Sequence, residues 1–257
     1  MCFDHDSRPP ILPIAGGALD GARTTLTGAD GNTFWAYRAR PTTPSGAGVL
    51  ILPDVRGLHP FYDELSLRFA EHDIDALAID WFGRTAGLTS RDADFEYTPH
   101  VSATTWAGIE TDVRAGVAAL RADGIERVFT IGFCMGGRMS FLAATLDLDL
   151  TGAIGLYGTL VGPWRNDAPE PVATVADSGA ASPILGLFGG ADPAIPAEHV
   201  AAFEDALTDA GVAHRLVTYP DAPHSFFDRK APDFATESAA AWDEVVAFIA
   251  AEGEPAG

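Results

Sequence analysis

Residues 128–146, VFTIGFCMGGRMSFLAATL, decide the fold. The stretch opens on five residues, 128–132, which lack the polar alternation of a half-buried strand and therefore predict a strand buried on both faces. Residues 139–146 predict a helix, which the chain enters near Met135. The sequence here predicts a buried strand that leads through a tight, glycine-rich turn into a helix.

The same alternation of strand and helix continues on both sides of this stretch. From residue 49 to the end it predicts a mostly parallel sheet with helices on both faces, an α/β fold. Residues 22–27 and 33–40 flank the turn Asp30-Gly31-Asn32 and predict a hairpin. The other expected strands are 48–52, 76–79, 153–157, 184–188 and 215–219, and the other expected helices are 65–72, 105–122, 196–210 and 238–251.

The chain is expected to form one domain. Its 257 residues show no internal repeat and no change of composition that would mark a boundary. Residues 1–20, which hold three prolines, predict an irregular arm, and residues 21–252 predict a single globular unit. Residues 163–183 are rich in Pro, Ala, Asp and Gly and predict a long loop, a kind of segment that is often functional or mobile.

The charge of the chain excludes several classes of partner. It has 36 acidic and 16 basic residues, a formal net charge of −20, and only one lysine, Lys230. Nucleic acids and anionic lipids both require clustered positive charge, so neither is an expected partner. No apolar run reaches the roughly 20 residues that cross a bilayer, and the first 20 residues lack the pattern of a signal peptide. Two cysteines, Cys2 and Cys134, form no disulfide framework and favour a reducing cytoplasm.

The turn between strand and helix matches a nucleophile elbow, with cysteine in place of the usual serine. Its sequence is Gly132-Phe133-Cys134-Met135-Gly136-Gly137. Residues two before and two after the nucleophile must lack a colliding side chain, and Gly132 and Gly136 meet that condition. The helix start points N–H groups and positive dipole at the sulfur, which favours the thiolate. The alternative is that Cys134 is an ordinary buried cysteine that behaves as a small hydrophobic residue.

A thiol used for acyl transfer needs a base and a carboxylate that orients the base. The elbow fold places them in the chain order nucleophile, acid, histidine. Asp192 follows an expected buried strand, and His224 follows the next strand, so both meet this order. Asp221 is a weaker candidate for the acid because it shares a loop with His224. The alternatives are a turn aspartate before Pro193 and a solvated loop histidine.

With these residues in place the chain resembles the dienelactone hydrolases. The motifs that carry the resemblance are the cysteine elbow, Gly189-Gly190-Ala191-Asp192 and Pro223-His224-Ser225-Phe226. It implies an α/β-hydrolase fold, no cofactor, and hydrolysis of a lactone or related ester through an acyl-cysteine. It also implies that the carboxylate of Asp54 faces the thiol, at a position where the family usually has Glu. The backbone N–H groups of Val55 and Met135 would then form the oxyanion hole, which stabilises developing negative charge.

The substrate-binding residues depart from the family. Hydrolases of dienelactone hold the substrate carboxylate with arginines, one of them four residues after the histidine. Here that position is Asp228, and an arginine, Arg229, comes one residue later. Because arginine binds carboxylates in pairs of hydrogen bonds, its loss should change substrate preference. The other expected substrate-binding residues are Arg91, Tyr97, Tyr157 and Trp164.

Two other functions fit the same residues. A broad carboxylesterase or thioesterase would use the same fold and chemistry on another small-molecule ester. A non-catalytic member of the fold could use Cys134 as a redox switch, although that role needs neither Asp192 nor His224 in this order. A metal site is not expected, because no His, Asp or Cys cluster has ligand spacing. The chain is expected to be a monomer or a small homo-oligomer.

Overall fold

A computed structural model describes residues 6–14, 20–164, 167–178 and 182–253. The strands are β1 Asp20–Thr27, β2 Thr33–Arg40, β3 Ala47–Leu52, β4 Asp75–Ile79, β5 Arg127–Phe133, β6 Gly152–Leu156, β7 Ile184–Gly189 and β8 His214–Tyr219. The helices are α1 Pro60–Ala70, α2 Gly83–Ala86, α3 Tyr97–Ala103, α4 Trp106–Ala122, α5 Met135–Ala143, α6 Pro171–Ser178, α7 Ala197–Asp209 and α8 Ala235–Ala250.

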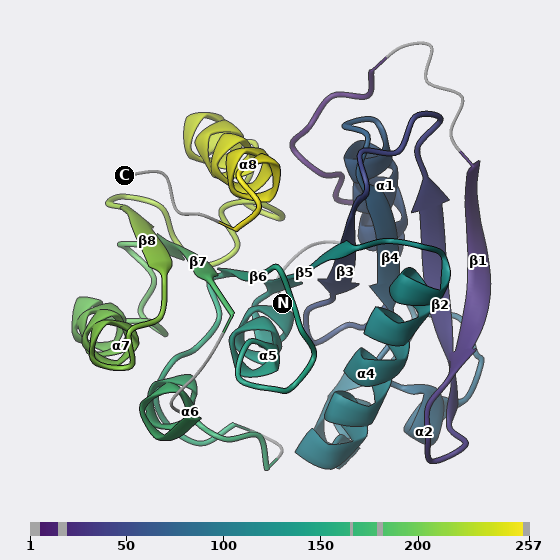
Figure 1. Ribbon diagram of the computed structural model, residues 1–257, viewed down its shortest axis with the longest axis horizontal. Coiled ribbons are helices and arrows are strands. Elements are labelled where there is room, and N and C mark those ends of the chain that lie inside the picture. The colour runs from purple at the N-terminus through teal and green to yellow at the C-terminus, as the bar shows by residue number, and fades with distance from the viewer. Residues whose placement is uncertain (1–5, 15–19, 165–166, 179–181, 254–257) are drawn as a thin grey trace.

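The eight strands form one sheet in the order β1-β2-β4-β3-β5-β6-β7-β8. The hairpin β1–β2 and the β2–β4 pair are antiparallel, and every pair from β4 to β8 is parallel. Helices α1 and α8 cover one face of the sheet, while α4 and α5 cover the other (Figure 1). The prediction of a mostly parallel sheet between helices is therefore confirmed.

The central strands are buried on both faces, as their apolar runs predict. All residues of β3, β4, β6 and β7 are buried, and β5 is exposed only in part, at Arg127. The outer strand β1 is the opposite case, since nearly all of it is exposed. Among the described residues no helix is long and apolar enough to cross a bilayer.

Several helix predictions were incomplete or misplaced. The helix expected over 65–72 is α1, which begins at Pro60 because proline suits the first helical turn and Phe61 and Tyr62 add to its buried face. Helices α2 and α3 were not predicted. The loop expected over 163–183 contains α6, whose Val175 is fully buried; the high Pro and Ala content hid this short apolar pattern.

The described part of the arm, residues 6–14, has no helix or strand, as predicted, and the rest of residues 1–19 lies outside the described residues. Ile11 nevertheless packs against the core, and Arg8 pairs with Glu64 at 2.8 Å. Asp20 belongs to β1, so the strand starts two residues earlier than expected. The arm is therefore held against α1 at these contacts.

Asp63, on α1, carries a partly buried charge that should lower stability at neutral pH. Its side chain is 21% exposed, and it pairs with Arg23 at 3.1 Å. Burial raises the pKa of Asp63 to about 6, although Arg23 opposes the shift. A carboxyl with a raised pKa binds protons more tightly in the folded chain, so the free energy of unfolding falls as pH rises from 3.8 to about 6.

We expect Asp63→Asn to be more stable than the parent chain, with an advantage that grows by about 1 kcal/mol between pH 5 and pH 8. Urea unfolding of both proteins at the two pH values measures this difference. Asp205→Asn, at an exposed position of α7, makes the same change of residue and corrects for the general effect of a lower net charge. An advantage of equal size at both pH values would contradict the assignment to Asp63.

Candidate active site

The loops that carry the nominated residues leave one edge of the sheet. In the parallel register Leu52 lies beside Gly132, Phe133 beside Leu156, and Gly189 beside Tyr219. The carboxyl ends of β3, β5, β6, β7 and β8 therefore align. Asp54, Cys134, Tyr157, Asp192 and His224 each lie within five residues of one of these ends, and this edge is where open α/β sheets build their sites.

The turn after β5 has the geometry of an elbow. Cys134 adopts φ 54° and ψ −111°, a conformation that side chains rarely occupy, and it is the residue before the first turn of α5. A Cβ on Gly132 would lie 1.9 Å from the carbonyl oxygen of Gly136, and one on Gly136 would lie 1.9 Å from that of Leu52. Only glycine fits at these two positions, because strand and helix backbones touch there.

The elbow is fixed by its neighbours and leaves the cysteine partly exposed. The Cys134 N–H donates to the Leu156 carbonyl at 3.0 Å, which ties the elbow to the end of β6. The thiol is free and its residue is of intermediate exposure. Met135 opens α5, and the first N–H groups of a helix have no intrahelical partner, so they remain available to an anion beside the sulfur.

Asp192 and His224 form a hydrogen-bonded pair. His224 Nδ1 lies 2.6 Å from Asp192 Oδ2, and the other Asp192 oxygen accepts the Ala194 N–H at 2.9 Å. The Asp192 side chain is fully buried, whereas the His224 side chain is 28% exposed. The loops are joined as well, since the Ala191 N–H donates to the Ala222 carbonyl at 3.0 Å. A buried carboxylate thus orients a more accessible imidazole, while Asp221 is exposed.

Asp54 and Val55 lie in a tight turn after β3. Asp54 is fully buried; its Oδ1 accepts the Arg56 N–H at 2.8 Å, and its own N–H donates to the Tyr62 hydroxyl at 2.9 Å. No hydrogen bond within the described part of the chain uses the Val55 N–H. The N–H groups of Asp54 and Arg56 thus fix the turn, and the Val55 N–H between them can donate to another acceptor.

Arg91 lies in a buried ion pair. Its guanidinium contacts Asp80 at 2.8 Å and also donates to the carbonyls of Thr89 and Gly87, so protein partners occupy all three nitrogens. Asp80 in turn accepts the Leu58 N–H at 3.0 Å. The contacts show that Arg91 ties the loop after β4 to the loop that carries Asp54; they give it no group to spare for a substrate.

The other nominated substrate-binding residues lie in several places. Tyr157 is buried with φ 41°, and its ring centroid is 5.1 Å from that of His224. Arg229 follows the histidine turn and is partly exposed. Tyr97 opens α3, and both it and Trp164 pack against the apolar cluster on the α4 side of the sheet. Only Tyr157 is joined to the histidine by a described contact.

Two residues at this edge were not predicted as part of the site. In the sequence Asp228 was noted only because it stands where the family has an arginine. In the structure it is buried and accepts a hydrogen bond from the Tyr157 hydroxyl at 2.7 Å. Arg138 is fully buried in α5 and donates to the carbonyls of Gly162 and Pro169 at 2.9 and 2.7 Å. Burial lowers the pKa of Arg138 to about 10. A charged residue in an otherwise apolar helix was the available signal for Arg138.

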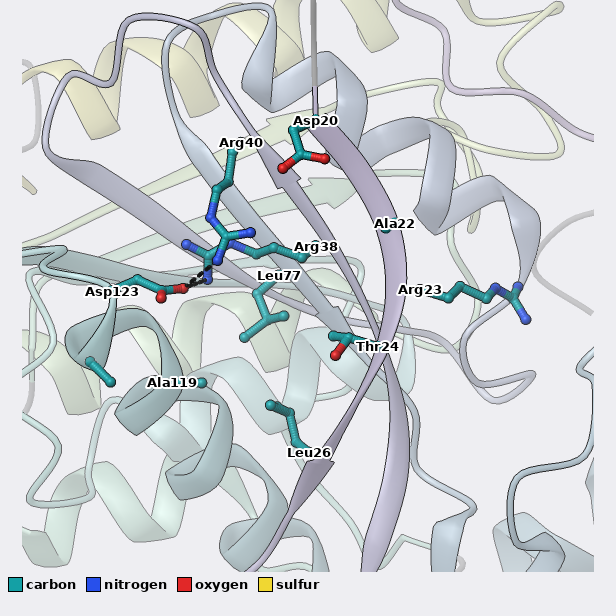
Figure 2. Close-up of a pocket in the computed structure, with 11 residues that line it drawn as sticks. Asp20, Ala22, Arg23, Thr24, Leu26, Arg38, Arg40, Leu77, Ala119 and Asp123 are labelled. Carbon is teal, nitrogen blue, oxygen red and sulfur yellow. Dashed lines mark hydrogen bonds and ion pairs between the residues drawn. The ribbon is translucent and has the colours of Figure 1, made fainter.

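A groove of about 510 Å³ lies away from these residues, between β1 and the end of α4. At one end Arg38 and Arg40 both contact Asp123, at 3.0 and 2.9 Å (Figure 2). None of the residues nominated from the sequence lines it. Within the described ranges no three His, Cys, Asp or Glu side chains gather as metal ligands would.

The mostly parallel sheet between helices, with Cys134 in the turn after β5 and the Asp192–His224 pair after β7 and β8, has the architecture of an α/β-hydrolase fold. The model of the dienelactone hydrolase family matches residues 34–253. The chain belongs to this family and is a hydrolase, which confirms the resemblance seen in the sequence.

Relatives of the same kind cover nearly the whole chain. A Salmonella typhimurium protein with the name "Putative carboxymethylenebutenolidase" is 29% identical over 95% of this chain and 92% of its own length. An Escherichia coli protein of the same name is 30% identical over 82% of this chain and 79% of its own. The crystal structure of a "Putative Dienelactone Hydrolase" from Klebsiella pneumoniae is similar to this one with a TM-score of 0.79 and 27% sequence identity, and the match covers 91% of this chain and 99% of that one.

Proposed function

We propose that this hydrolase cleaves a lactone or related small carboxylic ester through an acyl-cysteine on Cys134, with His224 as base and Asp192 as its orienting acid. The observation that carries the proposal is the 2.6 Å pair of His224 and buried Asp192 at the sheet edge that also bears the strained Cys134 elbow. The name carboxymethylenebutenolidase, borne by the relatives, supports a lactone as the substrate class.

In the first half of the reaction the cysteine forms the acyl-enzyme. His224 takes the thiol proton at Nε2, because Nδ1 is engaged with Asp192. Cys134 Sγ then bonds to the carbonyl carbon, and the N–H groups of Val55 and Met135 hold the resulting oxyanion. The carbon–oxygen bond of the ester breaks, and the leaving oxygen takes the proton from His224. In a lactone that oxygen remains part of the acyl chain.

In the second half water releases the product. His224 accepts a proton from water, whose oxygen bonds to the acyl carbon, and the carbon–sulfur bond then breaks. The sulfur recovers its proton from His224, and the carboxylic acid leaves. The cycle uses no metal or cofactor group and requires a reduced Cys134, in agreement with the reducing cytoplasm expected from the sequence. The carboxylate of Asp54, also at this edge, is the group we assign to face the thiol at rest.

Trapping the intermediate tests this function. The protein is mixed with p-nitrophenyl acetate, quenched in acid within milliseconds, digested and analysed by mass spectrometry. We expect an acetyl group on the peptide that contains Cys134 and steady release of p-nitrophenol afterwards. Rates for p-nitrophenyl esters, thioesters and dienelactone then separate a lactone hydrolase from a broad esterase. Turnover with the acetyl group on another residue, or reversible oxidation of Cys134 without turnover, would contradict the proposal.

Asp192→Asn should lower kcat by about 10³- to 10⁴-fold. The amide keeps the size of the carboxylate but cannot stabilise the imidazolium and favours the wrong tautomer of His224. Steady-state kinetics with p-nitrophenyl acetate measure the loss. Asp221→Asn, on the exposed acid in the loop that carries His224, is the control and should retain parent activity. Equal kcat in the Asp192 variant and the parent would exclude Asp192 as the orienting acid.

A further inference from the structure

Asp228 is held beside the histidine of the candidate site. It lies four residues after His224 and is 2% exposed, and its N–H donates to the Ser225 carbonyl at 3.2 Å, which folds the turn back on itself. Its Oδ2 accepts the hydroxyl of Tyr157, whose ring in turn contacts the His224 ring. Asp228 is thus fixed by a residue that also packs against the imidazole.

The carboxyl of Asp228 accepts hydrogen bonds but has no salt-bridge partner among the described residues. No Lys, Arg or His in the described part of the chain makes an ion pair with it, and Arg229 reaches it only through its backbone N–H. Burial, opposed by the Tyr157 and Arg229 hydrogen bonds, raises the pKa of Asp228 well above its ordinary value. The charge of Asp54 adds to this rise and that of His224 opposes it, so both lie close enough to interact with Asp228.

Two buried acids therefore share this edge of the sheet, Asp54 from the loop after β3 and Asp228 from the loop after β8. A substrate carboxylate placed there would be a third acid in a poorly solvated site, where burial penalises every charge that has no partner. Arg91, a residue nominated to hold a substrate carboxylate, is already occupied by Asp80. A substrate carboxylate would therefore meet Asp54 and Asp228 here, and Arg91 is not free to bind it.

We propose that Asp228, together with Asp54, makes this site select uncharged esters and lactones and reject substrates that carry a free carboxylate near the scissile carbonyl. The inference rests on the proposed hydrolase function and gives it a substrate class. It sets this chain apart from hydrolases that hold dienelactone by its carboxylate.

Dienelactone and its methyl ester form the matched pair that tests this selectivity. Both have the same ring. The products are analysed so that only opening of the lactone is counted, and kcat/KM for that step is divided by the rate of ring opening by hydroxide to remove the difference in intrinsic reactivity. We expect the parent protein to prefer the methyl ester by at least about 10-fold at pH 7. The preference should grow as the pH rises, because burial raises the pKa of Asp228 and the carboxyl then ionises. The Asp228→Asn variant separates the ionisation of Asp228 from that of the other groups at the site.

Three variants assign the effect. Asp228→Asn, which keeps the shape and cannot ionise, should show a smaller preference that no longer rises with pH. Asp228→Arg should favour the free acid, provided that circular dichroism shows it folded. Asp221→Asn, in the same loop but exposed, should keep the parent ratio at every pH. A parent preference for the free acid that disappears in Arg229→Gln would overturn the proposal and assign carboxylate binding to Arg229.

Failure of the selectivity differs from failure of the function. Turnover of both lactones at equal corrected rates, or an unchanged pH-dependent preference in Asp228→Asn, would refute the role of Asp228 and leave the hydrolase intact. Absence of turnover on both lactones and on p-nitrophenyl acetate would refute the proposed function and the selectivity with it.

Discussion

Replacing Cys134 by alanine should lower kcat/KM for ester substrates by about 10⁵-fold or more. Alanine removes the sulfur that forms the acyl-enzyme in the proposed mechanism. When catalytic residues act as one unit, the loss of the nucleophile costs nearly as much as the loss of all of them. The rate that remains would come from the oxyanion hole and substrate binding alone. The side chain is small and partly exposed, so its loss should leave the fold intact.

The measurement is kcat/KM on p-nitrophenyl acetate for the parent and for Cys134→Ala, with circular dichroism and thermal unfolding on both. We expect nearly equal melting temperatures and very different rates. Cys134→Ser is a second comparison, because it keeps a nucleophile of similar size with a much higher pKa, and it should fall between the two. Equal rates in the parent and the alanine variant would show that Cys134 is not the nucleophile.

Gly136→Ala is expected to have the largest effect on stability. The new methyl group would lie 1.9 Å from the carbonyl oxygen of Leu52 and 2.5 Å from that of Pro53. Both contacts are with backbone, and β3 and β5 are adjacent central strands of the sheet, so neither chain can move without breaking the ladder. We expect a loss of at least about 4 kcal/mol, which is a large part of the stability of a typical domain.

Urea unfolding of Gly136→Ala and the parent measures this loss, and a failure to accumulate as folded protein would agree with it. The matched control is Gly108→Ala, the same change near the start of α4. There the nearest atoms to an added Cβ are side-chain atoms of Thr105 and Arg84, at 3.1 and 3.4 Å. We expect the control to stay within about 1 kcal/mol of the parent. Parent stability in Gly136→Ala would mean that helix α5 and strand β3 do not touch at the elbow.

The positions of Asp192 and His224 show what the order of strands along the chain can predict about the site. Strands β7 and β8 are neighbours in sequence and in the sheet, so residues just after them must lie near each other. The sequence therefore predicted a pair that the structure places at 2.6 Å. The same reasoning could not decide which arginine is available to bind a substrate, because Arg91 and Arg229 lie in loops whose paths depend on packing.

The sequence alone determined the parts of this protein that depend on local pattern. Continuous apolar runs fix the buried parallel strands, and Gly132 and Gly136 fix the elbow around Cys134, since no other residue tolerates such close backbones. Helix α6 was not predicted because its apolar pattern is too short to be distinguished from a loop. Only the tertiary structure decided the partners of isolated polar groups: Arg91 with Asp80, and Asp228 with Tyr157, 71 residues apart. A buried charge takes its role from what surrounds it, and those surroundings exist only once distant segments have packed together.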